Sequence, residues 1–160
     1  MITIKNVLVP TDFGEAADSA LTYGRTLARN FGARLHVLHV VDNALLFAGT
    51  EGIAYDFALV QTQIEDAARK KLADLVGSDG ITVVRSGTSP AFVIVDYAKE
   101  NNVDLIVVGT HGRGMMAHLL IGSVAERVVR MSPCPVLTVR NPEHEFVIPD
   151  ALEVAVKAKG

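Results

Sequence analysis

Two kinds of segment alternate along the chain, and the spacing of their apolar residues tells them apart. The first kind is short, rich in β-branched residues and almost continuously apolar, which is typical of strands buried on both faces of a parallel sheet. The pattern predicts five such strands, at residues 6–10, 35–41, 81–84, 103–109 and 136–139.

Between these runs the apolar residues recur at helical spacing. The inward stripes include Phe31 in the first helical segment and Val129 in the fourth. Gly32 and Gly77 are placed to end the first two helices, because glycine readily adopts the left-handed conformation of a helix C-cap. Ser89 is placed as an N-cap, and a proline follows it at the first helical position. The predicted helices span about residues 16–31, 57–75, 90–98 and 123–129.

Strand and helix alternate four times before the fifth strand, which predicts an α/β fold with right-handed crossovers and helices on both faces of one sheet. We expect residues 1–140 to form a single domain and residues 141–160 to be a C-terminal extension. Residues 43–55 form a long predicted loop with an apolar tip. This loop could fold over a ligand as a lid or serve as a surface for a protein partner, and the sequence leaves both open.

Composition excludes several classes of function. Of 160 residues, 49% are apolar and 21% charged, which is globular and not disordered composition. A net charge of −3 gives no electrostatic footprint for nucleic acid or an anionic membrane, so we expect neither partner. Apolar runs are far shorter than the roughly 20 residues that span a bilayer. The single cysteine, Cys134, cannot form an internal disulfide, so we expect a cytoplasmic protein and a small apolar role for this thiol.

The residues that follow the strands carry the candidate chemistry, because ligands bind at the carboxyl ends of an open parallel sheet. Pro10, Thr11 and Asp12 follow the first strand. An Asp there accepts hydrogen bonds from sugar hydroxyls or an exocyclic amine, or it simply forms an N-cap or Asx-turn at the entry to the first helix. An apolar slot near Pro10 and Val40 suits a base.

The segment after the fourth strand is rich in glycine. Gly109 and Gly112 are separated by two residues, and Gly122 follows after nine more, with Ser123 directly behind it. Glycines allow positive φ and close backbone approach, so main-chain N–H groups can converge on an anion. The helix that begins near Ser123 adds a positive dipole end, and Arg113 could add a charge. On spacing alone, the alternative stays open that these glycines only make a turn and that Ser123, with Glu126, only forms a capping box.

Two other phosphate-binding loops are excluded. The chain has no G-x-x-x-x-G-K-[ST] segment, and no G-x-G-x-x-G follows the first strand. The protein is therefore expected to be neither a Walker-type NTPase nor a usual dinucleotide-binding domain.

Taken together, these motifs resemble those of the universal stress protein family. The spacing G-x2-G-x9-G-[ST], residues 7–13, residues 38–42 and residues 132–139 all carry the resemblance, in order, over about residues 2–140. It implies an adenine nucleotide alpha hydrolase-like fold with five parallel strands in the order 3-2-1-4-5. It also implies membership of the branch that binds ATP, since the glycine signature is complete.

The resemblance further implies which residues meet the nucleotide. Asp12 would contact the ribose or adenine side, and the backbone of Val40 would hydrogen-bond the adenine. The ribose and phosphates would be wrapped by the glycine segment and the following helix. Any Mg²⁺ would be carried by the phosphates and water. The predicted site comprises Pro10, Thr11, Asp12, Val40, Gly109, His111, Gly112, Arg113, Gly122, Ser123 and Val124.

No convincing catalytic set accompanies these residues. His111 is expected to be a loop residue that makes a backbone or phosphate contact, although it could in principle act as a base. His36 and His39 are expected on one face of the second strand, as sheet-face or crevice-edge residues and not as metal ligands. We therefore expect slow ATP hydrolysis at most, and a role as a nucleotide-dependent stress regulator with an unknown protein partner.

The fifth strand is predicted to be a sheet edge, and residues 136–139 lack an interior proline or lysine to protect it. We expect a two-fold homodimer through this strand, as the resemblance also implies, unless residues 146–148 of the extension cover the edge. Two other functions fit the sequence less well. A nucleotide-free dimeric scaffold would not need the glycine segment. An ATP-pyrophosphatase-type adenylating enzyme would need a glycine- and serine-rich phosphate loop after the first strand, and residues 10–14 do not supply one.

Overall fold

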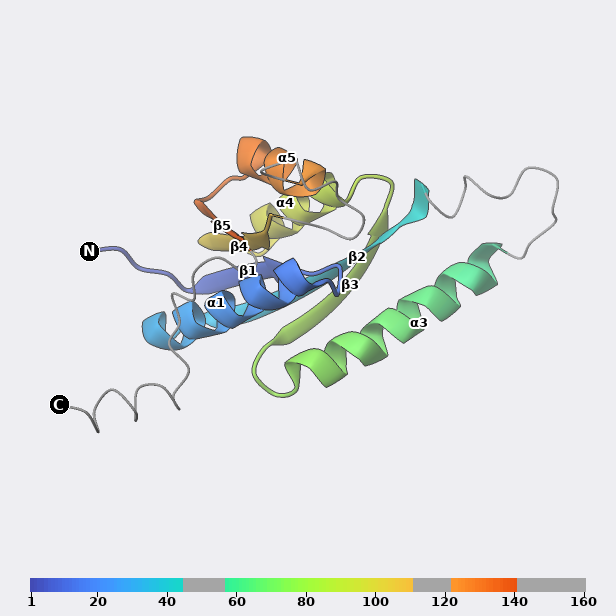
Figure 1. Cartoon of the computed structure of the whole chain (residues 1–160), viewed down its shortest axis with the longest axis horizontal. Coiled ribbons are helices and arrows are strands. Elements are labelled where there is room, and N and C mark those ends of the chain that lie inside the picture. The colour runs from blue at the N-terminus through green and yellow to red at the C-terminus, as the bar shows by residue number, and fades with distance from the viewer. Residues whose placement is uncertain (45–56, 111–121, 141–160) are drawn as a thin grey trace.

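The computed structural model describes residues 1–44, 57–110 and 122–140. Strands and helices alternate as the apolar pattern predicts, and the first and fifth strands have the predicted bounds (Figure 1). The elements in chain order are β1 (Asn6–Pro10), α1 (Glu15–Phe31), β2 (Arg34–Asp42), α3 (Phe57–Val76), β3 (Ile81–Gly87), α4 (Pro90–Glu100), β4 (Leu105–Gly109), α5 (Ser123–Met131) and β5 (Val136–Val139).

The five strands form one parallel sheet in the order β3-β2-β1-β4-β5. This confirms the predicted fold class and strand order. The order reverses at β1, since the chain builds outward through β2 and β3 and then returns to add β4 and β5 on the other side. No helix in the described part of the chain combines the length and apolar character that a membrane crossing needs.

Helices cover both faces of the sheet, α1 and α3 on one and α4 and α5 on the other (Figure 1). The side chains of each strand alternate between these two layers, as the pleat requires. In β1, Val7 and Val9 pack into the layer with α1 and α3, whereas Leu8 packs into the layer with α4 and α5. In β2, Val37 and Leu38 divide in the same way. The nearly continuous apolar runs therefore follow from burial on both faces.

The strands separate at the point where the order reverses. β1 pairs with β2 as far as Pro10–Leu38, but its pairing with β4 ends at Leu8–Ile106. The ladder toward β2 continues one residue further, because the Thr11 N–H donates to the Leu38 carbonyl at 2.9 Å. A fork thus opens between the carboxyl ends of β1 and β4.

Helix ends confirm most of the predicted caps. Gly32 and Gly77 both have positive φ, near 60°, and the Gly32 N–H closes α1 on its last carbonyls. Ser89 lies at the N-cap of α4 with Pro90 behind it, but its side chain makes no capping bond. Two inward assignments were wrong: Phe31 and Val129 are each nearly half exposed, because both lie past the edge of the stripe that meets the sheet.

The two histidines of β2 lie on opposite faces, so the expectation of one shared face was wrong. An offset of three residues reverses the side-chain direction in a strand. His39 stacks on Phe13 in the α1 layer, with ring centroids 4.5 Å apart. His36 is buried against Tyr97 of α4, with its Nδ1 2.8 Å from the tyrosine hydroxyl. Among the described residues, nothing hydrogen-bonds its buried Nε2.

Burial, assisted by the nearby positive charge of Arg34, lowers the pKa of His36 below its usual value of 6.5. Below about pH 6.5 the unfolded chain therefore binds a proton that the folded chain does not, and stability falls as the pH drops toward the folded pKa. We expect the free energy of unfolding of His36→Phe to rise relative to wild type between pH 7 and pH 5, by at most about 1.4 kcal/mol per pH unit. Urea titrations at several pH values measure this, and parallel curves for the two proteins would contradict it.

Candidate functional site

The loop from β1 to α1 is held by its own polar side chains. Thr11 is buried, and its Oγ1 accepts a hydrogen bond from the Phe13 N–H at 3.0 Å. Asp12 Oδ1 accepts from the Gly14 N–H at 2.9 Å, which makes an Asx-turn, and Gly14 is the N-cap of α1. The Asx-turn that the sequence allowed for Asp12 is therefore present, and it fixes the direction of the carboxylate.

Phe13 adopts an unusual backbone conformation in this loop. Its φ is +62°, a region in which a residue with a side chain costs roughly 1–3 kcal/mol. Neighbouring contacts stabilise it: the ring stacks on His39, and Lys71 of α3 places its Nζ 4.4 Å from the ring centroid. His39 Nδ1 lies 2.8 Å from the Thr11 carbonyl. Contacts from β2 and α3 thus set the shape of the loop that carries Asp12.

The N-terminus of α5 points main-chain donors at the same region. Gly122 is the N-cap, and its own N–H donates to the Thr110 carbonyl at 2.5 Å. The first bond within the helix runs from Glu126 to the Gly122 carbonyl, so the N–H groups of Ser123, Val124 and Ala125 have no acceptor within the helix. Together with the helix dipole, these groups favour an anion.

The alternative in which Ser123 and Glu126 form a capping box is not what the structure shows. Ser123 is the first residue of α5 and not its N-cap, and no side chain caps the helix. Glu126 instead forms an i,i+4 ion pair with Arg130 at 2.8 Å. The N-cap is Gly122, which has no side chain to accept hydrogen bonds from the N–H groups of the first turn.

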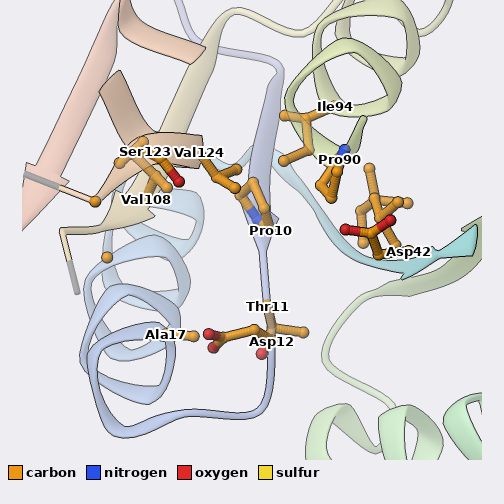
Figure 2. Close-up of a pocket in the computed structure, with 15 residues that line it drawn as sticks. Pro10, Thr11, Asp12, Ala17, Asp42, Pro90, Ile94, Val108, Ser123 and Val124 are labelled. Carbon is orange, nitrogen blue, oxygen red and sulfur yellow. The ribbon is translucent and has the colours of Figure 1, made fainter. Parts of the chain in front are cut away.

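A cavity of about 320 Å³ lies in the fork between β1 and β4 (Figure 2). Its size falls in the range of small-molecule sites, and most of its wall is apolar. Figure 2 shows Asp12 beside Ala17 at one end and Asp42 near Pro90 at another. The lining residues are Pro10, Thr11, Asp12, Ala17, Leu38, Val40, Asp42, Pro90, Ile94, Val108, Gly109, Gly122, Ser123, Val124 and Ala125.

Eight of the eleven residues that the sequence suggested line this one cavity. They come from four separate segments, at the ends of β1, β2 and β4 and at the start of α5. The remaining three, His111, Gly112 and Arg113, lie outside the described residues, as do residues 45–55 of the loop expected at 43–55 and the extension at 141–160.

Sequence reasoning did not assign the part of the cavity wall formed by the end of β2 and the start of α4. Asp42, Pro90 and Ile94 line the cavity and were not assigned to it. A signal was present, because α4 follows β3 and so also begins at the carboxyl edge of the sheet. Asp42 ends β2 two residues after Val40, and a period of two puts both side chains on one face.

The main chain of β2 is open beside the cavity. The Leu38 carbonyl accepts from Thr11, so it points toward β1, and the N–H and carbonyl of Val40 point the same way by the alternation of the strand. β1 has ended at that level. Val40 therefore offers one donor and one acceptor to the space beyond β1.

Gly109 serves packing more than backbone freedom. Neither Gly109 nor Gly122 has a positive φ, so the expected need for that conformation is not met at these two positions. A Cβ on Gly109 would lie 2.5 Å from the Ala16 carbonyl oxygen of α1. Glycine at this position lets the first turn of α1 approach β4.

The described residues give little support for a metal site or for a reactive cysteine. No group of three or more His, Cys, Asp or Glu side chains there could hold a metal ion. Cys134 is half-buried and packs against the core beside α4 and α5, and burial raises the pKa of its thiol. At neutral pH the thiol is therefore a poor nucleophile.

A parallel sheet of this order, with a cavity at its reversal point, defines the adenine nucleotide alpha hydrolase-like class of α/β folds. The chain belongs to the universal stress protein family, whose model matches residues 3–140. It is 33% identical over 146 residues to a universal stress protein, MJ0531, from Methanocaldococcus jannaschii, which covers 88% of this chain and 85% of the relative.

Solved structures agree with this membership. The hypothetical protein MJ0577 superposes with a TM-score of 0.76 at 28% identity, over 89% of this chain and 100% of that one. Two others share the fold at lower identity. One is a universal stress protein in complex with cAMP, at 24% identity and a TM-score of 0.60 over 88% of this chain and 100% of its own length. The other is a universal stress protein from Archaeoglobus fulgidus in complex with dAMP. It has 22% identity and a TM-score of 0.54, over 87% of this chain and 99% of its own length.

The close approach of the α1 backbone to Gly109 can be tested by adding a single methyl group at this position. Gly109→Ala places a methyl group against the α1 backbone, which cannot give way as a side-chain tip can. We expect a loss of about 1–3 kcal/mol in the free energy of unfolding, measured by urea titration. Thr138→Ala, at an exposed position of the neighbouring β5, should change it by no more than about 0.5 kcal/mol. Equal effects of the two substitutions would contradict this packing role.

Proposed function

We propose that this protein binds ATP in the cavity between β1 and β4 and acts as a nucleotide-dependent stress regulator. The observation that carries the proposal is a preformed cavity with apolar walls, onto which the unpaired N–H groups at the start of α5 open. An apolar slot suits a base, and the helix N-terminus suits phosphates. These two features lie at different parts of one cavity, as a nucleotide requires.

The residues present fit each part of the ligand. The base would lie between Pro10 and Val40 and use the open main chain of Val40. Asp12, turned by its Asx-turn, would accept hydrogen bonds from the ribose hydroxyls. The phosphates would meet the N–H groups of Ser123 and Val124, and the predicted contacts of residues 111–113 belong to the same end. Mg²⁺ would be held by the phosphates and water.

Binding without efficient turnover follows from the same chemistry. Among the described residues, the polar side chains that line the cavity are those of Thr11, Asp12, Asp42 and Ser123, on otherwise apolar walls. Neither His36 nor His39 lines the cavity, so neither is placed to act as a base on a bound phosphate. A protein that binds ATP and retains it suits a role in which the bound state is read by a partner, in the reducing cytoplasm that a single free cysteine indicates.

Gly122 offers the sharpest test of the binding site. Gly122→Leu introduces a large side chain where the N-cap now lines the cavity, with an N-cap backbone (φ −68°, ψ 153°) that leucine also adopts. We expect wild type to bind ATP in an isothermal titration and the variant to show no binding at concentrations that saturate wild type. The thermal unfolding midpoint should stay close to that of wild type.

Val129→Leu is the matched control. It places the same leucine side chain on α5, at an exposed position outside the cavity lining. It should bind ATP as wild type does. Absence of ATP binding by the wild-type protein, with no nucleotide released from it by acid, would contradict the proposed function and favour a nucleotide-free scaffold.

We further propose that two copies pair through β5. β5 is the last strand of the sheet, and its side chains at Leu137 and Thr138 are exposed. The Val139 carbonyl accepts from Thr110 and so points toward β4, which by alternation turns the N–H and carbonyl of Thr138 toward the open edge. An edge of this kind recruits a second strand.

Thr138→Pro tests the pairing, because it removes the outward N–H while leaving the bonds from β5 to β4 in place. We expect wild type to sediment at twice the mass of one chain and Thr138→Pro to sediment as a monomer. Thr138→Val keeps the N–H and should remain dimeric. A monomeric wild-type protein would end this part of the proposal.

A further inference from the structure

The wall of the cavity that faces α4 contains a carboxylate that no predicted contact uses. Asp42, the last residue of β2, lies on the same strand face as Leu38 and Val40, and all three line the cavity. Its partner in the register of β3 is Gly87, which brings no side chain against it. The apolar side chains of Pro90 and Ile94 of α4 line the same cavity, and Asp42 lies near Pro90 (Figure 2).

This carboxylate is oriented but not neutralised. Asp42 Oδ1 accepts a hydrogen bond from the Ala44 N–H at 2.9 Å, which fixes the rotation of the group. Arg85, the basic residue of β3, forms an ion pair with Glu100 at 2.6 Å and lies over the Tyr97 ring. In the described part of the chain, no cation pairs with Asp42. An ionised carboxylate only accepts hydrogen bonds, so its natural partner is a donor on the ligand.

The strand geometry says which part of a nucleotide that donor belongs to. If the base uses the open main chain of Val40, as the proposed function requires, the carboxylate two residues further along the strand lies beside the same edge of the base. The exocyclic amine of adenine has two hydrogens. One can be donated to the Val40 carbonyl, and the other remains for a second acceptor.

We propose that Asp42 adds to the selection of the base beside the Val40 carbonyl, by accepting the second hydrogen of the 6-amino group of adenine and disfavouring purines with a 6-keto oxygen. A keto oxygen in that position would face both the Val40 carbonyl and the carboxylate, and neither could donate to it. Sites built to receive a ligand donor reject an analogue that lacks it, because their own polar groups are then left unpaired. This inference rests on the proposed function, because it concerns the same cavity.

The test compares ATP with ITP, whose base carries a keto oxygen in place of the amine. We expect wild type to bind ATP at least about tenfold more tightly than ITP in equilibrium titrations. Asp42→Asn should reduce that ratio by about tenfold, because an amide can turn its NH₂ toward the keto oxygen.

Asp12→Asn is the matched control, since it makes the same chemical change in the carboxylate assigned to the ribose. It should weaken the binding of ATP and ITP together and leave their ratio unchanged. The ribose is identical in the two ligands, so a change in ratio is specific to a contact with the base.

Three outcomes overturn the inference, and each differs from a failure of the proposed function. Equal binding of ATP and ITP to wild type shows that the base is not read at this position. An unchanged ratio in Asp42→Asn shows that another group reads it. A drop in the thermal unfolding midpoint of Asp42→Asn with an unchanged ratio shows instead that the carboxylate serves the N-terminus of α4. Absence of ATP binding by wild type defeats the proposed function itself.

Discussion

The separation of β1 from β4 after Leu8 and Ile106 is the constraint on which the rest of the molecule depends. β1 stays paired with β2 beyond this point, and its last contact is the bond from Thr11 to the Leu38 carbonyl. The strand is therefore held on one side and free on the other. Because the connections leave the sheet in opposite directions at this reversal, α1 covers one face and α5 returns over the other, and the space between them becomes the cavity.

In the part of the chain that the structure describes, the main chain as well as side chains supplies polar groups that face this space. The main-chain donors come from the first turn of α5 and the open part of β2, whereas the walls are mostly apolar, with the hydroxyls of Thr11 and Ser123 and the carboxylates of Asp12 and Asp42 among them. Such main-chain groups are rigid recognition elements. Its loop is stabilised from outside the cavity by His39, Phe13 and Lys71, so α3 is coupled to a site that it does not line.

Much of this arrangement could be predicted from the sequence, because burial on both faces produces nearly continuous apolar strands and glycine marks the helix ends. The cavity wall from β1, β2 and α5 followed from the rule that ligands bind at the carboxyl ends of strands. The same rule places the start of α4 at this edge, but which of its side chains reach the cavity, here Pro90 and Ile94, depends on how closely α4 packs toward α5. The exposure of Phe31 and Val129 and the N-cap role of Gly122 likewise depend on packing at the level of single residues. The opposite directions of His36 and His39, by contrast, follow from their three-residue offset and could have been predicted.

The N-cap glycine of α5 adopts a backbone conformation that is open to most amino acids. If its bare Cα is what keeps the cavity open, then stability places little constraint on this position, and selection on ligand occupancy alone would maintain it. A lineage released from that selection could lose the crevice through a single codon change and keep an intact sheet. In such a fold the ability to bind a ligand could be lost while the ability to fold is kept. A well-folded descendant would therefore not necessarily bind a ligand in this cavity.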